Sequence, residues 1–302
     1  MVKIAVELEQ ALAQKALSGV SGQATERKLA GGRGWDVADV LCTSGPQDRP
    51  FEELHNHYSV AVVAAGTFQY RSSAGTALMT PGSLLLGTAG AHFECAHDHG
   101  AGDRCIAFRY SPEYFEKLVS QSGIRSSKAR FSAPRVPPVK AISTLVARAL
   151  TGTSGMEQSR WEELAIMIAA RAIELANGGG RASDDPPSAV ARVTRVVRRV
   201  ERQPDDALTL NSLADEAGLS PYHFLRVFES LTGVTPHQYI VRARLREAAF
   251  RLSAEPDKIL DVALDCGFAD ISNFNRAFRA EFGTTPRDYR RLRGNRLRRL
   301  PW

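Results

Sequence analysis

Hydrophobic and polar residues follow two different patterns along this chain of 302 residues. From Val37 to Tyr110, short runs typical of β-strands are separated by frequent turn signals, among them Gly66, Gly75 and Pro81-Gly82. Beyond Ala189, apolar residues recur at helical spacing and no β-type alternation remains. The pattern predicts an α+β fold, with a β-sandwich or barrel in the N-terminal part and an all-α C-terminal part.

Helical spacing also flanks the β region, over residues 3–17, 138–151 and 156–177. The last of these stretches carries an apolar stripe made of Trp161, Leu164, Ile168 and Ala172. A segment rich in Gly, Pro, Ser and Asp follows at residues 178–188, and such composition is typical of a linker. We therefore predict a first domain over 1–180, a linker over 181–190, a helical domain over 191–293 and a basic tail over 294–302.

The helical part contains an internal repeat. At an offset of 50 the coinciding pairs are Phe224/Phe274, Arg226/Arg276, Phe228/Phe278, Gly233/Gly283, Thr235/Thr285, Pro236/Pro286 and Tyr239/Tyr289. At an offset of 49 they are Leu213/Val262, Ala214/Ala263, Gly218/Gly267 and Leu219/Phe268. One unit therefore occurs twice, with one extra residue in the turn of the second copy.

Each unit is predicted to form a helix, a tight turn and a second helix. Gly218 and Gly267 can adopt the positive φ that a short turn between helices commonly needs. Ser220 is placed as an N-cap before Pro221, and Asp270 is the equivalent cap in the second unit. The spacing thus predicts two helix-turn-helix units.

The second helix of each unit has a polar face opposite its apolar one. Glu229 also lies on the first of these faces, but we do not predict that it contacts DNA. The residues that we predict to contact DNA are Tyr222, His223, Leu225, Arg226, Ser272, Asn273, Asn275, Arg276 and Arg279. Arg, Asn, Ser and His have the hydrogen-bonding groups that base edges in a major groove require. The plainer interpretation is a solvated face on a helical bundle, but two copies with Arg at the same position favour DNA.

The charge distribution supports this interpretation. The net charge is +6, from 39 Lys and Arg against 33 Asp and Glu. Residues 1–190 carry 19 basic and 19 acidic side chains, whereas residues 191–302 carry 20 basic and 14 acidic ones. All but one of those 20 are Arg, which fits phosphate and guanine edges better than Lys does.

Residues 191–293 closely resemble the DNA-binding domain of the AraC/XylS family. The matching residues are Leu213-Ala214, Ala217-Gly218-Leu219-Ser220, Phe224-Leu225-Arg226-Val227-Phe228, Gly233, Thr235-Pro236, Tyr239-Ile240, Gly267-Phe268, Asn273-Phe274-Asn275-Arg276-Ala277-Phe278, Gly283 and Pro286. The resemblance implies two helix-turn-helix subdomains joined by a central helix at about 236–252, with both recognition helices in successive major grooves. It also implies that Tyr222, Leu225, Arg226, Ser272, Asn273 and Arg276 face bases. Leu225 departs from the polar residue often found there and could only contact a thymine methyl.

The N-terminal part looks like a cupin, the β-barrel that often forms the effector domain in this family. The similarity rests on His55-Asn56-His57 and on Gly75 followed by Pro81-Gly82. A metal-binding cupin would carry a Glu where Ala61 and Val62 stand. The resemblance therefore implies a cupin-like barrel without the usual set of metal ligands.

Other soft ligands occur in the same part. Cys95, His97, His99 and Cys105 are candidate ligands for zinc or iron, and Cys42, His55 and His57 add to the set. Gly100 and Gly102 favour a loop, in which the histidines need not point the same way. Buried thiols and hydrogen-bonded histidines, or a redox sensor at Cys95 and Cys105, are the alternatives. We predict no bound metal and no cofactor.

Taken together, these features predict an effector-responsive, sequence-specific transcription regulator that is not an enzyme. The alternatives are a metal-dependent cupin enzyme fused to a DNA-binding domain and an architectural DNA-binding protein with no effector. The expected partners are promoter DNA, a small-molecule effector in the barrel, RNA polymerase for an activator, and a second copy through residues 138–177. Four scattered cysteines indicate the reducing cytoplasm. The longest apolar run, Val60–Ala65, is too short to span a membrane, and a signal-peptide core is lacking.

Overall fold

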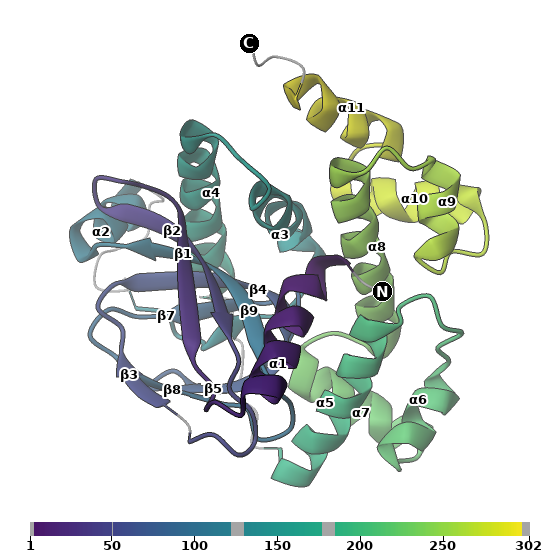
Figure 1. The fold of residues 1–302 in the computed structure, drawn as a ribbon, viewed down its shortest axis with the longest axis horizontal. Coiled ribbons are helices and arrows are strands. Elements are labelled where there is room, and N and C mark those ends of the chain that lie inside the picture. The colour runs from purple at the N-terminus through teal and green to yellow at the C-terminus, as the bar shows by residue number, and fades with distance from the viewer. Residues whose placement is uncertain (1–2, 50, 122–129, 177–184, 298–302) are drawn as a thin grey trace.

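The structure, a computed structural model, describes residues 3–49, 51–121, 130–176 and 185–297. Its N-terminal part contains two antiparallel sheets (Figure 1). The first sheet has the strand order β1 (Ala24–Gly32), β2 (Trp35–Cys42), β9 (Asp103–Tyr110), β4 (Tyr58–Gly66), β7 (Leu84–Gly87) and β10 (Arg135–Val136). The second has the order β3 (Phe51–Leu54), β8 (His92–Ala96), β5 (Phe68–Ser72) and β6 (Gly75–Met79).

The middle of the first sheet is buried on both faces. Along β4, Val60, Val62 and Ala64 belong to the core shared with the helices, whereas Ala61 and Val63 belong to the core between the two sheets. Because successive side chains of a strand point to opposite faces, a continuous apolar run suits a strand in this position. The run that sequence analysis singled out is therefore the middle of a sheet covered on both sides.

The predicted barrel is not closed. The ladders of the two sheets are separate in the described part of the chain, and the chain passes from β4 in the first sheet to β5 in the second at Gly66. Gly66 has φ 81°, and a Cβ built there would lie 2.2 Å from the carbonyl oxygen of Gly102. A glycine is needed for this change of sheet. The structure confirms a β-rich N-terminal part, as two facing sheets and not as a closed barrel.

Helices cover the outer face of the first sheet and one edge of the N-terminal part. They are η1 (Lys3–Ala5), α1 (Val6–Ser18), α2 (Pro112–Gln121), α3 (Lys140–Gly152) and α4 (Gln158–Ala176). The predicted apolar stripe of α4 is buried against the sheet, where the Tyr110 hydroxyl donates a hydrogen bond to the carbonyl oxygen of Ala165 at 2.7 Å. The stripe therefore stabilises this domain and is not free for a partner. The larger apolar side chains that α4 leaves exposed are Ile166 and Met167.

The C-terminal part is entirely helical in the residues described. It comprises α5 (Pro187–Arg202), α6 (Leu210–Ala217), α7 (Pro221–Thr232), α8 (Pro236–Ala254), α9 (Ile259–Asp265), α10 (Ile271–Phe282) and α11 (Pro286–Leu297). Of the predicted linker, residues 181–184 lie outside the described residues and residues 187–190 form the first turn of α5. Of the predicted basic tail, 294–297 continue α11 and 298–302 lie outside. None of the described helices combines the length and apolar character needed to cross a bilayer.

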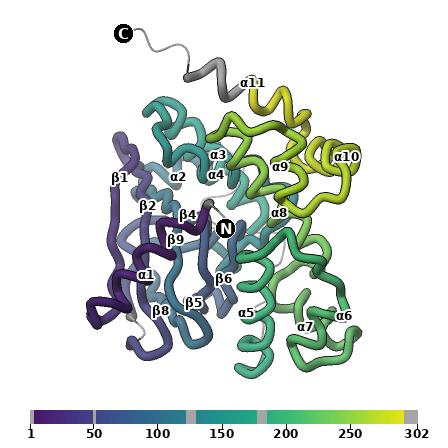
Figure 2. Tube along the Cα trace, turned by 45° about the vertical axis from the view of Figure 1, so that its right-hand side comes forward, coloured from purple at the N-terminus to yellow at the C-terminus, as the bar shows by residue number. Residues whose placement is uncertain are grey.

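Helix α8 lies between helices α5–α7 and helices α9–α11 (Figure 2). It contributes to two separate hydrophobic cores, one with each group. Its first half contributes Tyr239, Ile240 and Ala243 to a core with α5, α6 and α7. Its second half contributes residues such as Leu245 and Leu252 to a core with α9, α10 and α11. Two helical subdomains joined by one long helix were expected, and α8 extends two residues beyond the predicted end at 252.

Candidate nucleic-acid interface

The first helix-turn-helix unit, α6–α7, has a short turn that depends on one glycine. Gly218 ends α6 in the left-handed conformation with φ 63°. The amide of Leu219 then donates to the carbonyl oxygen of Ala214 at 3.0 Å. This bond satisfies a carbonyl that the end of the helix would leave without a partner, and it fixes the direction in which the chain leaves α6.

The second unit, α9–α10, repeats this geometry with one more residue. The amide of Phe268 donates to the carbonyl oxygen of Ala263 at 3.1 Å. Both residues lie 49 positions after Leu219 and Ala214, which form the equivalent hydrogen bond in the first unit. The N-cap of the following helix is Ser220 in the first unit and Asp270 in the second, at the offset of 50. The extra residue of the second turn is therefore Ala269, between Phe268 and the cap, as the repeat predicted.

Both recognition helices, α7 and α10, begin at capped first turns. The Ser220 hydroxyl accepts a hydrogen bond from the amide of His223 at 3.4 Å. The Asp270 carboxylate accepts one from the amide of Asn273 at 2.7 Å. These caps hold the first turn, which carries several of the predicted contact residues, in a defined helical conformation.

The interiors of the two units pack alike. The Phe224 and Phe228 rings lie 5.5 Å apart at 56°, and so do the rings of the equivalent pair, Phe274 and Phe278. In each unit the second phenylalanine meets a tyrosine from the next helix edge-on at 80°, at 5.7 Å for Tyr239 and at 5.3 Å in the second unit. The recurrence of this geometry shows that the sequence repeat is a structural repeat.

All but one of the predicted contact residues on these helices are exposed. Tyr222 is 71% exposed, and Leu225 is the half-buried exception. The exposed set also contains His223, Arg226, Ser272, Asn273, Asn275, Arg276 and Arg279. Within it, the Arg276 guanidinium donates to the side-chain oxygen of Asn273 at 3.1 Å, so these two groups lie side by side on α10.

A shallow hollow beside α10 adds a residue that sequence analysis had not selected. It is lined by Asn275, Arg276 and Arg279 on one side and by Thr285, Pro286 and Arg287 at the start of α11 on the other. Arg287 brings a further guanidinium to the edge of the polar face. The repeat could have indicated it, because Arg287 lies 50 residues after His237, at the same place in the helix that follows the unit.

The candidate ligands of the N-terminal part do not form one group. His55 stacks on Phe93 with ring centres 4.0 Å apart and its Nε2 lies 2.8 Å from the Tyr70 hydroxyl. Burial lowers the pKa of His55 to about 4, so its ring is neutral at physiological pH. His57 is exposed, and His99 lies in a hollow lined by arginines of α5, among them Arg195.

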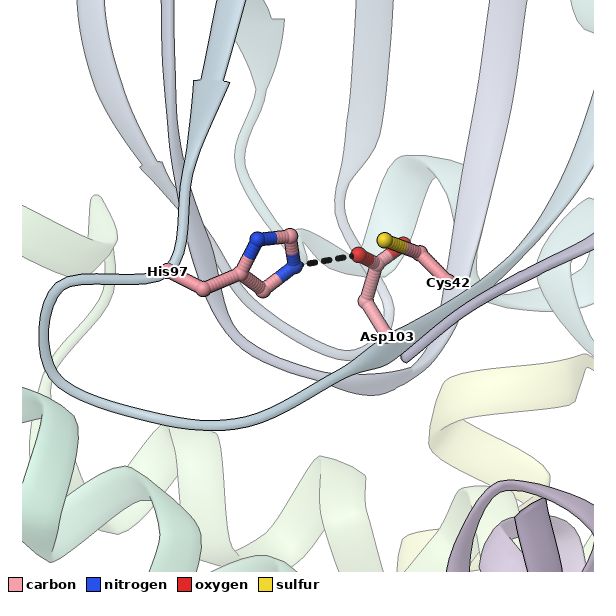
Figure 3. Close-up of side chains that lie close together, drawn as sticks. All are labelled: Cys42, His97 and Asp103. Carbon is pink, nitrogen blue, oxygen red and sulfur yellow. Dashed lines mark hydrogen bonds and ion pairs between the residues drawn. The ribbon is translucent and has the colours of Figure 1, made fainter. Parts of the chain in front are cut away.

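A smaller cluster does form around His97, with Cys42, which sequence analysis named beside the main candidates, and with Asp103, which it did not name. Nε2 of His97 lies 2.7 Å from Oδ1 of Asp103, and the Cys42 thiol lies beside them (Figure 3). The Cys105 thiol donates to Oδ2 of Asp103 at 3.3 Å. Burial raises the pKa of the Cys42 thiol and raises those of Cys95 and Cys105 well above the usual range. All three are therefore neutral thiols at physiological pH.

The comparisons with known proteins identify the C-terminal part. Residues 213–292 match the helix-turn-helix domain family. The chain is 33% identical over 98 residues to the regulatory protein SoxS of Salmonella typhimurium, covering 32% of this chain and 92% of SoxS. It is 30% identical over 105 residues to the transcriptional regulator MtrA of Neisseria gonorrhoeae, covering 35% of each chain. Thus it spans only about a third of the length of MtrA.

Among solved structures, the DNA-binding domain of AdpA in complex with a target DNA is 29% identical, with a TM-score of 0.34, over 35% of this chain and 97% of that one. The match to SoxS covers nearly the whole of that protein. The chain belongs to the AraC/XylS family of helix-turn-helix transcription regulators.

Proposed function

We propose that the protein regulates transcription by binding a specific promoter sequence, with α7 and α10 reading two successive major-groove elements. The observation that carries this proposal is the pair of helix-turn-helix units with equivalent cores, each presenting an exposed Arg at the same position, Arg226 and Arg276. An Arg side chain can donate two hydrogen bonds to one guanine edge. Family membership supports the same function.

The contact residues divide by chemistry. Arg226, Arg276 and Arg279 are suited to guanine or phosphate, and Asn273 and Asn275 to adenine. Tyr222, His223 and Ser272 add donors and acceptors near the capped first turns, where helix N-termini also favour phosphate. Leu225 contributes apolar contact alone, so its half-buried position suits a thymine methyl.

For the N-terminal part we propose a cupin-like domain that binds a small-molecule effector between its two sheets. The space there is lined by apolar side chains such as Phe68 and Phe93, together with polar ones such as His55 and Arg109. A mostly apolar cavity with a few polar groups is the usual form of a small-molecule site. A homodimer, RNA polymerase as the partner of an activator, and a cytoplasmic location complete the proposal. The enzyme alternative is not favoured, because the relatives are transcription regulators.

The test is selection of bound duplexes from a random DNA pool with the full-length chain, followed by affinity measurements over a range of salt concentrations. We expect enrichment of two short elements about one helical turn, or roughly 10 base pairs, apart. Affinity for the selected duplex should fall as salt rises, because arginines that bind phosphate release counterions. Equal affinity for selected and scrambled duplexes would contradict the proposal.

A further inference from the structure

The cluster around His97 brings together residues from three strand ends. Cys42 ends β2 and Asp103 begins β9, and the two are directly paired across the ladder of the first sheet. His97 directly follows β8 in the second sheet. The three side chains lie close together (Figure 3). One potential ligand atom from each of the three lies within 4.8 Å of the others, and all three residues are buried. Strand pairing, and not a local motif, creates this cluster.

The Cys105 thiol lies next to this cluster and is the candidate for a fourth ligand. It lies two residues after Asp103 on β9, so both side chains point to the same face, and its Sγ is 3.3 Å from Oδ2 of Asp103. Like the other three residues, Cys105 is buried. The set is therefore two thiols, one imidazole and one carboxylate on the inner side of the first sheet.

These donors match zinc. Zinc is bound tetrahedrally by Cys sulfur at about 2.3 Å and by His nitrogen or carboxylate oxygen at about 2.0–2.2 Å. Ligand atoms around such an ion are then roughly 3.3–3.8 Å apart. The observed separations, from 2.7 Å for His97–Asp103 to within 4.8 Å for the three-residue set, bracket that range. The Cys105 thiol lies outside that three-residue set, so it has to turn from Oδ2 of Asp103 toward the ion to complete a tetrahedral site.

The buried negative charge of Asp103 also favours a bound metal ion. Its side chain is 9% exposed, and His97 Nε2 lies 2.7 Å from its Oδ1, whereas no lysine or arginine forms an ion pair with it in the described part of the chain. A thiol such as that of Cys105 is a weak hydrogen-bond donor. A buried carboxylate needs strong partners or a metal ion, and a divalent cation would provide one. The nearby Arg104 is directed elsewhere, to Asp39 and Glu7.

We propose that Cys42, His97, Asp103 and Cys105 bind one zinc ion. This assignment differs from the expectation that no metal is bound. It also differs from the candidate ligands named from the sequence, because His99 faces α5 and Cys95 is not among the four donors. On binding, the ion replaces the protons of the Cys42 and Cys105 thiols, which pass to solvent. No oxidation or reduction takes place.

The site also adjoins the DNA-binding part. His97 and Asp103 bound a loop whose Gly100 lies so close to α5 that a Cβ there would be 2.2 Å from Nη1 of Arg198. The amide of Gly100 also donates to the carbonyl oxygen of His97 at 3.3 Å. An ion held by His97 and Asp103 would fix both ends of the loop on which α5 rests.

The first experiment measures metal on the full-length chain. After chelation, we expect Co²⁺ to bind one per chain with the charge-transfer absorption of cobalt–thiolate bonds and the visible bands of a tetrahedral site. Zinc should displace the cobalt, and its binding in weak buffer should release about two protons per ion. Absence of stoichiometric binding, or cobalt bands without thiolate character, would overturn the proposal. None of these readouts requires DNA, so they are independent of the proposed regulatory function.

Variants assign the ligands. Cys42→Ser, His97→Gln and Cys105→Ser should each weaken zinc binding by about a hundredfold or more, since loss of residues that only orient ligands already costs roughly 10–100-fold. Cys266→Ser is the matched control, because Cys266 is also buried but lies in the core around α9 and α10. Circular dichroism checks that each variant is folded. Folded Cys42→Ser and His97→Gln chains that bind zinc as tightly as the control would exclude this site, and the same result for Cys105→Ser would exclude the four-ligand set.

Discussion

The two helix-turn-helix units have equivalent interiors but are attached to the rest of the molecule in different ways. In the first unit, Leu231 is buried in a core that also includes Leu78 of β6, and Gly233 lies against Pro137. In the second, the residue equivalent to Leu231 is Glu281, which accepts hydrogen bonds from Arg242 on α8 and Ser143 on α3. The repeat has kept the residues that pack each unit and changed those that connect it to its surroundings.

The first way to test this equivalence is to remove one core ring from each unit. Phe228→Ala and Phe278→Ala should each destabilise the protein by about 3–5 kcal/mol, because both rings are almost fully buried against a tyrosine. Urea unfolding followed by circular dichroism measures both. A loss below about 1 kcal/mol for one of them would show that the cores are not equivalent.

The polar attachment of the second unit is tested by Glu281→Ala. The variant leaves Arg242, whose side chain is 17% exposed, without its carboxylate partner. We expect a loss of about 1.5–3 kcal/mol, the range for hydrogen bonds to charged groups. Glu229→Ala on α7 is the control, because Glu229 is exposed and should change stability little. Equal unfolding free energies for the two variants would refute the attachment.

The variants Arg226→Ala and Arg276→Ala compare how the polar faces of α7 and α10 contribute to DNA recognition. Each should reduce discrimination in one of the two DNA elements by about 1–3 kcal/mol if the Arg contacts a guanine. Binding-site selection with each variant is the measurement, and Arg171→Ala on α4 is a control far from both units in sequence. If both variants blur the same base pairs, the two units do not read separate elements.

The smallest expected difference is between the two caps. Asp270→Ala should cost about 1 kcal/mol, and Ser220→Ala somewhat less, because the Ser220 hydrogen bond is longer. Thermal unfolding of the two variants gives the comparison. Asp270→Asn should retain most of the stability, since Asn is also a good cap; a loss as large as that of Asp270→Ala would argue against a capping role.

The helical part could be predicted closely because its determinants are local. Ser220 and Asp270 cap the helices as their positions indicated, and Ala269 is the extra residue that the change of offset required. Turns, caps and helical periodicity depend on residues a few positions apart, which a single sequence displays directly.

The N-terminal part could be predicted only in outline, because its arrangement depends on strand pairing. Cys42 and Asp103 are neighbours only because β2 pairs with β9 in one particular register, and no local spacing reveals that. The sequence signal that remained was the repetition of His and Cys near Gly100, which suggested His99 as a ligand. In the structure the loop at Gly100 directs His99 toward α5.

Helix α8 sets the relative rotation of the two units as well as their separation. Because its two halves belong to different cores, its 19 residues connect the units over about 28 Å without an intervening loop. Each residue of an α-helix turns the chain by about 100°. Deletion of one residue from the middle of α8 would shorten the connection by only about 1.5 Å, yet it would turn α10 far out of phase with α7. The angular phase of this one helix therefore determines whether both polar faces can meet the same side of a duplex.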